Sequence, residues 1–458
     1  MTTQTPQHRL VAESRRCLTL ALPLIGAQLA QAATGFVDTL MMGRLGRESL
    51  ASGALGSLLF MELLVVGTNL VATSSSFIAE AYGAQQPEQA GRWLNQGVWL
   101  AMAIALPLAL VMWNAQPWLQ LLGQPPAIVA LAETYLRAAS VAYLPALIFV
   151  ALRSFVSALF QPRIVVVLTL CGVVLNAIAN EVLAFGRWGF PALGLAGIGW
   201  STAFIYWTMA LVLVAYVLSQ SQFAKYRPLQ GLHRPHWADL WELVRVSLPV
   251  AVLSAFETGA FAVTAIFAGQ MGVVVLAAHQ IALQTVAVTF MVPLGISQAA
   301  TVRVGQCSGQ GDWHTARLSG IISLSLGGGF MGLMGLLILL APAQFVSIYV
   351  DLSDPANGEV VALAITLLTV GAIFQVVDGL QVVAAGALRG LKDTRIPMAI
   401  GLVAYWFVGV PSGYAAGFRL GLGGVGLWCG LAIGLAIAAV ALTWRFYRLT
   451  MAFKPVKS

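Results

Sequence analysis

Long apolar runs alternate with short polar connections along the whole chain. Twelve of these runs reach the length of about 20 residues that a helix needs to cross a hydrocarbon core of about 30 Å. They lie near 17–42, 53–80, 92–114, 132–160, 164–186, 192–219, 243–270, 274–302, 316–342, 358–388, 395–418 and 421–447. Alternating ten-residue strands are absent from the sequence, so helices are predicted to satisfy the backbone in the bilayer.

The two halves of the chain repeat one another. At an offset of 226 residues Pro23 falls on Pro249 and Gly46 falls on Gly272. Further on the offset becomes 229, where the glycine cluster at 194–199 resembles that at 423–428. Each half holds six spans, an even number, so both halves enter the membrane from the same side. This pattern predicts two related bundles with an axis along the membrane normal and a central site between them.

The predicted fold class is therefore an all-α polytopic membrane protein with twelve transmembrane helices in two six-helix bundles related by pseudo-twofold symmetry. The predicted segments are a cytoplasmic N-terminal tail at 1–16, a first bundle at 17–219, a cytoplasmic linker at 220–238, a second bundle at 239–448 and a cytoplasmic C-terminal tail at 449–458.

Composition and charge agree with this interpretation. The chain is 59% hydrophobic and only 9% charged, whereas a soluble domain carries about 25% charged residues. Of the 24 Lys and Arg residues, 19 fall in connections on the side of the N-terminus. The positive-inside rule then places both termini in the cytoplasm. The net charge of +7 is thus a topology signal, and no nucleic-acid partner is predicted.

Three carboxylates stand alone inside apolar spans: Asp38, Glu257 and Asp378. A charged side chain at mid-bilayer costs about 2.5–3.5 kcal/mol on insertion scales, so such residues usually mark an ion path or a proton relay. Their repeat mates are uncharged, namely Thr264, Gln31 and Phe149. The helices can therefore be built without these acids, and their presence indicates function.

The structural alternative is that each acid simply pairs with a neighbouring helix. No Lys or Arg lies in the middle of any span, so an obvious internal partner is missing. Shifting a carboxyl titration by two pH units costs about 2.7 kcal/mol, which is comparable to the insertion cost. Protonation or binding of an external cation could each relieve the isolated charge.

Polar and aromatic residues accompany the acids at helical spacing. Gln31 lies two turns before Asp38 on the same face. The remaining members of the set are Asn176 and Asn180 in the fifth span, Phe261 one turn after Glu257, Phe374 one turn before Asp378, and Gln284 in the eighth span. Carboxylates, amides and rings together suit an amphipathic cation, so these six residues are candidate substrate-binding positions.

Other chemistry finds no support in the sequence. The motifs GxxxxGK[ST], HExxH and GxSxG are absent, so no ATP hydrolysis or common protease chemistry is predicted. The chain is expected not to be an enzyme and to need no cofactor other than a coupling ion.

The chain resembles the multidrug and toxic compound extrusion (MATE) transporters, in their bacterial NorM-like branch. The resemblance rests on GFVDT at 35–39, AHQIAL at 278–283, VRVG at 302–305, ALRGLKDT at 387–394, and the stretch from Tyr405-Trp to Tyr414. It implies two six-helix bundles around a cleft and export of cationic drugs and dyes driven by H⁺ or Na⁺ entry. Asp38, Glu257 and Asp378 match the family's membrane acids, and Asn176 and Asn180 match its polar fifth-helix positions.

The resemblance also leads to predictions of the coupling ion and of the membrane in which the protein lies. NorM-like proteins commonly have Tyr where this chain has Phe374, and that hydroxyl is implicated in Na⁺ coordination. Because a hard cation wants several oxygen ligands, H⁺ is favoured; with Na⁺, Glu257 and Asp378 would be its ligands. The expected location is the bacterial cytoplasmic (inner) membrane, surrounded by lipid, as a monomer.

Two other functions stay open. A flippase for lipid-linked precursors can share this architecture, but its anionic substrate calls for Arg or Lys in the cavity, and these spans lack them. A channel is the second, and it cannot accumulate a substrate against a gradient.

Overall fold

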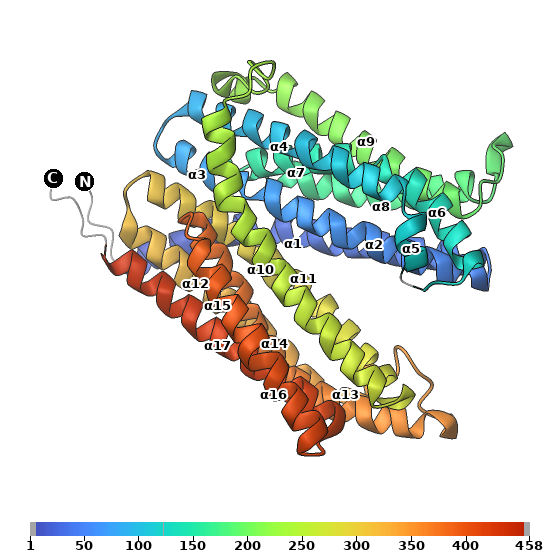
Figure 1. The fold of residues 1–458 in the computed structure, drawn as a ribbon. Helices are drawn as coiled ribbons and strands as arrows, with labels where there is room; N and C mark the ends of the chain where they lie inside the picture. The colour runs from blue at the N-terminus through green and yellow to red at the C-terminus, as the bar shows by residue number, and fades with distance from the viewer. Residues whose placement is uncertain (1–5, 122, 453–458) are drawn as a thin grey trace. The chain divides into compact units, whose positions relative to one another are not determined.

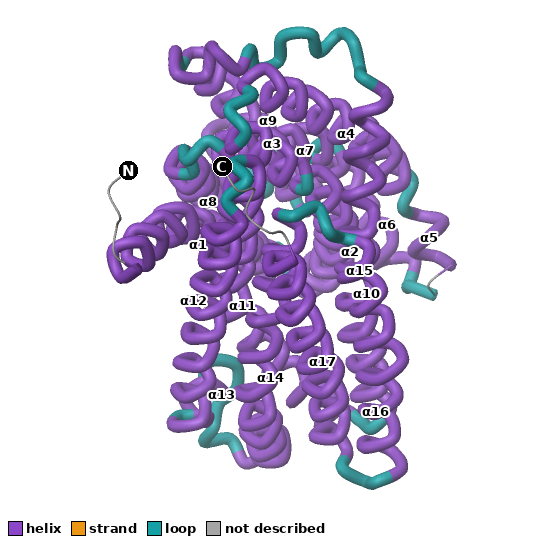
Figure 2. The backbone as a smooth tube through the Cα atoms, turned by 90° about the vertical axis from the view of Figure 1, so that its left-hand side faces the viewer, coloured by secondary structure: helices purple, strands orange, loops and turns teal. Residues whose placement is uncertain are grey.

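The computed structural model describes residues 6–121 and 123–452, and every regular element among them is helical (Figures 1 and 2). The first half holds α1 (Pro6–Arg44), α2 (Arg47–Ala72), α3 (Ser74–Gly83), α4 (Pro87–Trp113), α5 (Gln116–Leu121), α6 (Pro126–Ser140), α7 (Tyr143–Ala158), α8 (Arg163–Leu183), η1 (Arg187–Gly189), α9 (Leu195–Ser219) and η2 (Ser221–Tyr226). The second half holds α10 (Trp237–Gln270), α11 (Val273–Gly309), α12 (Trp313–Leu340), α13 (Pro342–Val346), η3 (Pro355–Asn357), α14 (Gly358–Gly390), α15 (Arg395–Gly401), η4 (Leu402–Gly409), α16 (Val410–Tyr414), η5 (Ala415–Arg419) and α17 (Gly423–Ala452).

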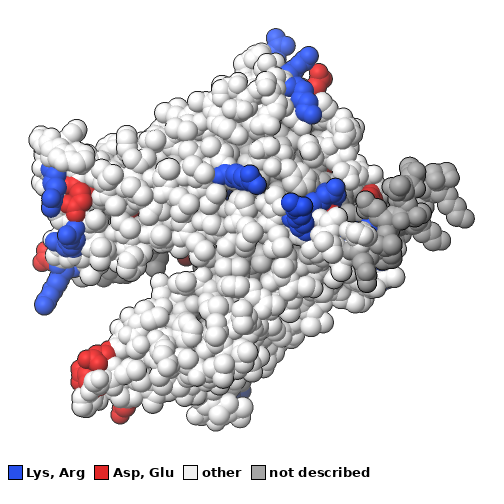
Figure 3. Space-filling model, turned by 180° about the vertical axis from the view of Figure 1, so that it is seen from behind, with Lys and Arg blue, Asp and Glu red and all other residues white. Residues whose placement is uncertain are grey.

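Twelve membrane spans follow from these helices. Eleven stretches of the described chain are long and apolar enough to cross a bilayer, with α2 and α3 forming one of them. The twelfth is the pair α6 and α7, which bends by 44° at the break between Ser140 and Tyr143. The predicted all-helical, twelve-span fold is confirmed. In the face seen in Figure 3, wide areas carry no charged side chain, as contact with lipid requires.

Backbone geometry repeats at the offsets found in the sequence. Gly46 caps the start of α2 with φ 113° and ψ 170°, and Gly272 caps α11 with φ 120° and ψ 169°. Gly194 before α9 has φ 58°, and Gly423 at the start of α17 has φ 54°. These positive φ values favour glycine, so the sequence repeat reflects the same turns built twice.

The described chain forms two compact units. Unit 1 comprises residues up to 28 together with residues from 252 onward, and unit 2 comprises 29–251. The borders fall inside α1 and α10, a few residues after Pro23 and Pro249, and not in the linker predicted at 220–238. The start of each first helix thus belongs to the unit built mainly from the other half of the sequence.

Close helix packing within each unit depends on glycine. In unit 2 a Cβ at Gly199 would lie 2.6 Å from the backbone oxygen of Tyr135. In unit 1 a Cβ at Gly430 would overlap the backbone of Gly413, and one at Gly386 would overlap Ser297. Small residues let membrane helices approach closely. This matters because van der Waals packing, and not the hydrophobic effect, drives helix association in the bilayer.

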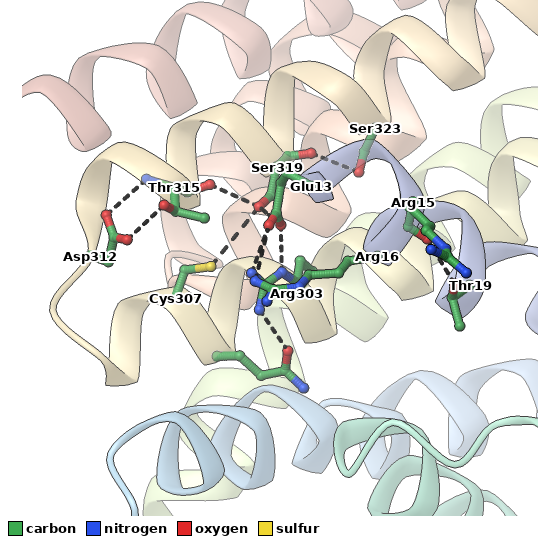
Figure 4. A network of polar contacts seen from close by, with 11 residues as sticks. Glu13, Arg15, Arg16, Thr19, Arg303, Cys307, Asp312, Thr315, Ser319 and Ser323 are labelled. Carbon is green, nitrogen blue, oxygen red and sulfur yellow. Dashed lines mark hydrogen bonds and ion pairs between the residues drawn. The ribbon is translucent and has the colours of Figure 1, made fainter. Parts of the chain in front are cut away.

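An ion pair anchors the start of α1 in unit 1. Glu13 faces Arg303 of α11 and Ser319 of α12 (Figure 4). The guanidinium binds both carboxylate oxygens, with 2.8 Å from Nη2 to Oε2, and Ser319 Oγ donates to Oε1 at 2.6 Å. Glu13 and Arg303 are 3% and 4% exposed. Residues 6–16, which the sequence places in a tail, are therefore helical, whereas residues 1–5 and 453–458 lie outside the described residues.

The eleventh span departs from regular α-helix. It runs from Arg395 to Arg419 and contains π-helical stretches at 402–409 and 415–419, on either side of Pro411. Proline removes a backbone donor, and π-helical turns occur often at functional sites. This irregular span carries Tyr405 toward the acidic residues of unit 1.

Candidate functional site

Unit 2 contains a cavity of about 60 Å³ next to Asp38. The Asp38 side chain is 6% exposed, and its Oδ1 accepts a hydrogen bond of 2.8 Å from Asn180 Nδ2. The same amide nitrogen lies 3.3 Å from Asn176 Oδ1, and both asparagines are fully buried. The cavity has room for a few water molecules.

Helical spacing brings this site together. Gln31, Thr34 and Asp38 line the cavity from one face of α1, as their spacing predicts. Gly172 and Asn176, which lie one turn apart on α8, also line the cavity. The structure thus places predicted residues Gln31, Asp38 and Asn176 around one cavity, with Asn180 bound to Asp38.

A basic residue shares the cavity, which corrects one expectation. Arg153, five residues before the end of α7, is only 7% exposed and lines the cavity together with Asp38. Its guanidinium forms no hydrogen bond or ion pair with any described residue. A long side chain near a helix end can carry its charge several ångströms along the helix. The position of Arg153 in the sequence therefore does not reveal that its guanidinium reaches the cavity. Unit 2 therefore has a basic cavity residue, and the expectation that these spans lack one is wrong there.

Glu181 has a structural role in the same unit. Its two carboxylate oxygens pair with Arg44 at 2.5 Å and with Arg187 at 3.0 Å. The neighbouring acid of α8 is thus neutralised by two arginines, unlike Asp38.

Unit 1 holds the other two acids. Asp378 of α14 is 4% exposed, and its Oδ1 has no hydrogen-bond partner among the described residues. Glu257 of α10 lies close enough for the two carboxyls to interact electrostatically. Gln381, one turn after Asp378, lies beside Glu257, and its Nε2 donates a 2.7 Å hydrogen bond to the Tyr405 hydroxyl.

Aromatic rings enclose this acidic pair. Phe261 and Phe374 make an edge contact with centroids 6.0 Å apart, and Phe374 contacts Trp428 at 5.3 Å. The indole of Trp428 in turn donates to His279 Nδ1 at 3.1 Å. This hydrogen bond joins α17 to α11. Predicted residues Glu257, Phe261, Phe374 and Asp378 therefore lie in one neighbourhood.

Very little space remains near the pair. The cavity beside Glu257 measures about 10 Å³ and is lined by Phe261, Tyr405, Gly409 and Leu431 among others. That volume is at the limit for a single water molecule. Pockets for drug-sized ligands measure about 300–1,000 Å³, so both of these cavities are too small for such a ligand. Gln284, the remaining predicted substrate residue, is exposed on α11.

Sequence reasoning missed two residues of these sites. Tyr405 lies in an aromatic run of α15 to η5, where nothing distinguishes a functional hydroxyl from a lipid-facing one. Arg153 lies near the end of its span, where a basic residue resembles the charges of the connections. A search for basic residues within two turns of a span's end would have found it.

Comparison with known proteins shows the family of the chain. The MatE family model matches residues 23–182 and 249–415. The chain is 40% identical to a probable multidrug resistance protein NorM of Synechocystis over 98% of its own length and 97% of the relative's. It is 43% identical to a protein of the same name in Pseudomonas putida, over 95% of this chain and 96% of the relative.

Solved structures show the same fold. The eukaryotic MATE transporter AtDTX14 superimposes with a TM-score of 0.84 at 20% identity, covering 97% of this chain and 100% of that one. An outward-facing MATE family transporter of the MOP superfamily matches with a TM-score of 0.86 at 18% identity, covering 100% of both chains.

The family model and the full-length relatives therefore make the protein a polytopic membrane transporter. More specifically, the chain belongs to the MATE family, and its full-length similarity is to the bacterial proteins named NorM.

Proposed function

We propose that this protein is a secondary active multidrug exporter that expels amphipathic organic cations in exchange for H⁺ by alternating access. Family membership and the names of the NorM relatives support drug efflux. The protein is not an enzyme in this scheme and uses no cofactor besides its coupling ion. It lies in the bacterial cytoplasmic membrane as a monomer, with both termini in the cytoplasm, as the distribution of Lys and Arg indicates.

One observation carries the proton assignment: Glu257 and Asp378 interact within unit 1, and the small cavity beside Glu257 has no basic residue among its described lining residues. Two ionised carboxyls in such a site repel one another, and neither has enough water to screen the charge. One proton relieves the repulsion and fits in the space available.

Exchange follows from competition for the same charge. In the outward-open state Glu257 and Asp378 take up a proton, which removes the negative charge that holds a cationic drug. The drug then leaves to the outside. After the change of access the proton leaves to the cytoplasm, and the recharged pair recruits the next cation. Bound ligand and proton thus favour opposite conformations.

Asp38 serves the same cycle in unit 2. Its carboxylate is held by Asn180 and stands in a cavity with room for water. Water allows protons to reach and leave this carboxyl. We assign Asp38 to sensing protonation in unit 2 and to transmitting it along α1, which passes Pro23 on its way into unit 1.

Sodium is the rival coupling ion. Its oxygen ligands would be Glu257 and Asp378, together with Gln381 Oε1, which has no partner among the described residues. Phe374 provides no oxygen where many NorM-like proteins have a tyrosine. Each oxygen ligand that is lost weakens the binding of a hard cation.

Proteoliposomes test the ion directly. We expect uptake of an organic cation into inverted vesicles under a pure pH gradient without Na⁺, and none under a pure Na⁺ gradient at constant pH. An uncoupler should abolish accumulation, which a channel could not produce at all. Transport that survives only under the Na⁺ gradient would overturn the proton assignment.

Arg153 also favours a second candidate, a flippase for anionic lipid-linked precursors, because its guanidinium is free to meet a phosphate. Asp38 in the same cavity weighs against a purely anionic substrate. Flipping of a fluorescent polyprenyl phosphate by the reconstituted protein, without drug accumulation, would support the flippase.

A further inference from the structure

A polar cavity of about 1010 Å³ lies in unit 2, apart from the Asp38 cavity, and no residue lines both. It forms where the start of α4 meets the segment that joins α9 to α10. Its walls are Gln86, Pro87, Glu88, Gln89, Arg92, Asn95 and Gln96 from the α4 side, and Tyr226, Arg227, Gln230, Gly231, Arg234 and His236 from the joining segment.

Specific contacts hold the joining segment against α4. Asn95 Nδ2 donates to the Gln230 carbonyl at 2.7 Å, and Trp99 Nε1 donates to the Leu232 carbonyl at 2.8 Å. The carbonyl of Tyr226 sits where a side chain at Gly91 would begin. The cavity is therefore a built feature of unit 2.

Positive charge exceeds negative charge around this cavity. Arg227 pairs with Glu88 at 3.1 Å, and Arg92 pairs with Asp239 of α10 at 2.9 Å. The Arg234 guanidinium has no ion pair or hydrogen bond among the described residues, and only its backbone N–H is bonded, to the Gly231 carbonyl at 3.0 Å. A third guanidinium is thus left to attract an anionic group, and guanidinium groups bind phosphate with good geometry.

Buried acceptors add a second requirement. Asn95 Oδ1 and Gln96 Oε1 belong to side chains that are 6% and 1% exposed, yet neither oxygen has a hydrogen-bond partner among the described residues. Burial, and to a lesser extent Tyr82, raises the pKa of Tyr226 to about 12, so its hydroxyl stays a neutral donor. Unpaired buried acceptors cost free energy. A fitting ligand therefore offers hydroxyl donors besides its anionic group.

The membrane surface supplies such a ligand. Both walls of the cavity connect spans on the side predicted to be cytoplasmic. Trp237 and Trp241 in the first turns of α10 are 72% and 66% exposed, as in the aromatic belts that mark the lipid headgroup layer. We propose that this cavity binds the headgroup of phosphatidylglycerol, with Arg234 on the phosphate and the glycerol hydroxyls on Asn95 and Gln96.

Calorimetry on the full-length protein in neutral detergent tests the site. We expect dioctanoyl-phosphatidylglycerol to bind at least about tenfold more tightly than dioctanoyl-phosphatidylcholine, and Arg234→Gln to weaken it about tenfold. Arg163→Gln is the matched control, because Arg163 is exposed on the same predicted side of unit 2. Equal affinity for the two lipids, or an equal loss in Arg163→Gln, would overturn the site.

Two further arms identify the source of the phosphate and the role of the acceptors. Free glycerol 3-phosphate should bind at least about tenfold more weakly than the lipid, because it lacks the acyl chains. Gln96→Met should weaken the binding of phosphatidylglycerol. It should leave the affinity for phosphatidic acid unchanged, because phosphatidic acid lacks the second glycerol. Equal binding of glycerol 3-phosphate would overturn the lipid assignment, and equal losses for both lipids would overturn the hydroxyl contacts.

Discussion

The two units are built from the same six-span plan but treat their acids differently. In unit 2 one carboxylate, Asp38, is bound by an amide and shares a cavity of about 60 Å³ with Arg153. In unit 1 two carboxyls share a site with Tyr405 and Gln381, next to a cavity of only about 10 Å³. The Asp38 cavity has room for water and a basic residue in its lining, whereas the cavity beside Glu257 is at the limit for one water molecule and has no basic residue among its described lining residues. This difference underlies our proposal that unit 1 binds the small coupling ion, whereas Asp38 of unit 2 senses protonation in a cavity with room for water.

Removing an acid of unit 1 should have the largest effect. Asp378→Asn removes one of the two carboxyls proposed to carry the coupling proton, and an amide cannot take up and release that proton, so we expect drug transport under a pH gradient to fall roughly 100-fold or more. Glu257→Gln should behave similarly. The matched control is Glu359→Gln, because Glu359 is an exposed acid at the start of the same helix, α14. Wild-type initial rates of dye efflux in Asp378→Asn would contradict the assignment.

Asp38→Asn should have a smaller effect. Its site is wetter, so water replaces part of the lost charge interaction, and we expect roughly a tenfold loss of transport. The asparagine can still accept the hydrogen bond from Asn180, so thermal stability should change little. If Asp38→Asn and Asp378→Asn lost equal activity in parallel efflux assays, the proposed division between the units would fail.

Arg153→Gln should shift substrate preference. Arg153 and Asp38 form no ion pair, so their interaction in a hydrated cavity is about 1 kcal/mol or less. We expect a threefold to fivefold gain, at most, in apparent affinity for cations that lack a carboxylate, roughly as that energy implies. Substrates that carry a carboxylate should lose affinity. Competition experiments with the two kinds of dye measure both changes, and parallel changes for both would exclude a role of the guanidinium in selection.

Tyr405→Phe should give the smallest change. The substitution removes the neutral hydrogen bond from Gln381, which contributes about 0.5–1.5 kcal/mol, so we expect a twofold to threefold change in proton-driven transport. Repeating the assay with Na⁺ sharpens the comparison. We expect no transport by either protein under a Na⁺ gradient; transport by the wild type that Tyr405→Phe abolishes would indicate that the hydroxyl is a Na⁺ ligand.

The sequence predicts most of the fold and the grouping of the acids. Hydrophobic runs locate all twelve spans because a bilayer demands length and apolarity, and the repeat predicts that Gly46 and Gly272 occupy equivalent turns. Helical spacing also predicts that Gln31 and Asp38 face one cavity. Contacts between helices are different, since they depend on packing. The burial of Glu13 against Arg303, the approach of Tyr405 from an irregular helix, and the inward reach of Arg153 each require distances across helices that spacing along one helix does not contain.

The central claim is that the Glu257–Asp378 pair carries the coupling proton. The most direct measurement is proton release from the purified protein on addition of a cationic drug, followed with a pH indicator in weakly buffered detergent solution. We predict release from the wild type and from Asp38→Asn, and none from Asp378→Asn. Release from Asp378→Asn at the wild-type level would contradict the account.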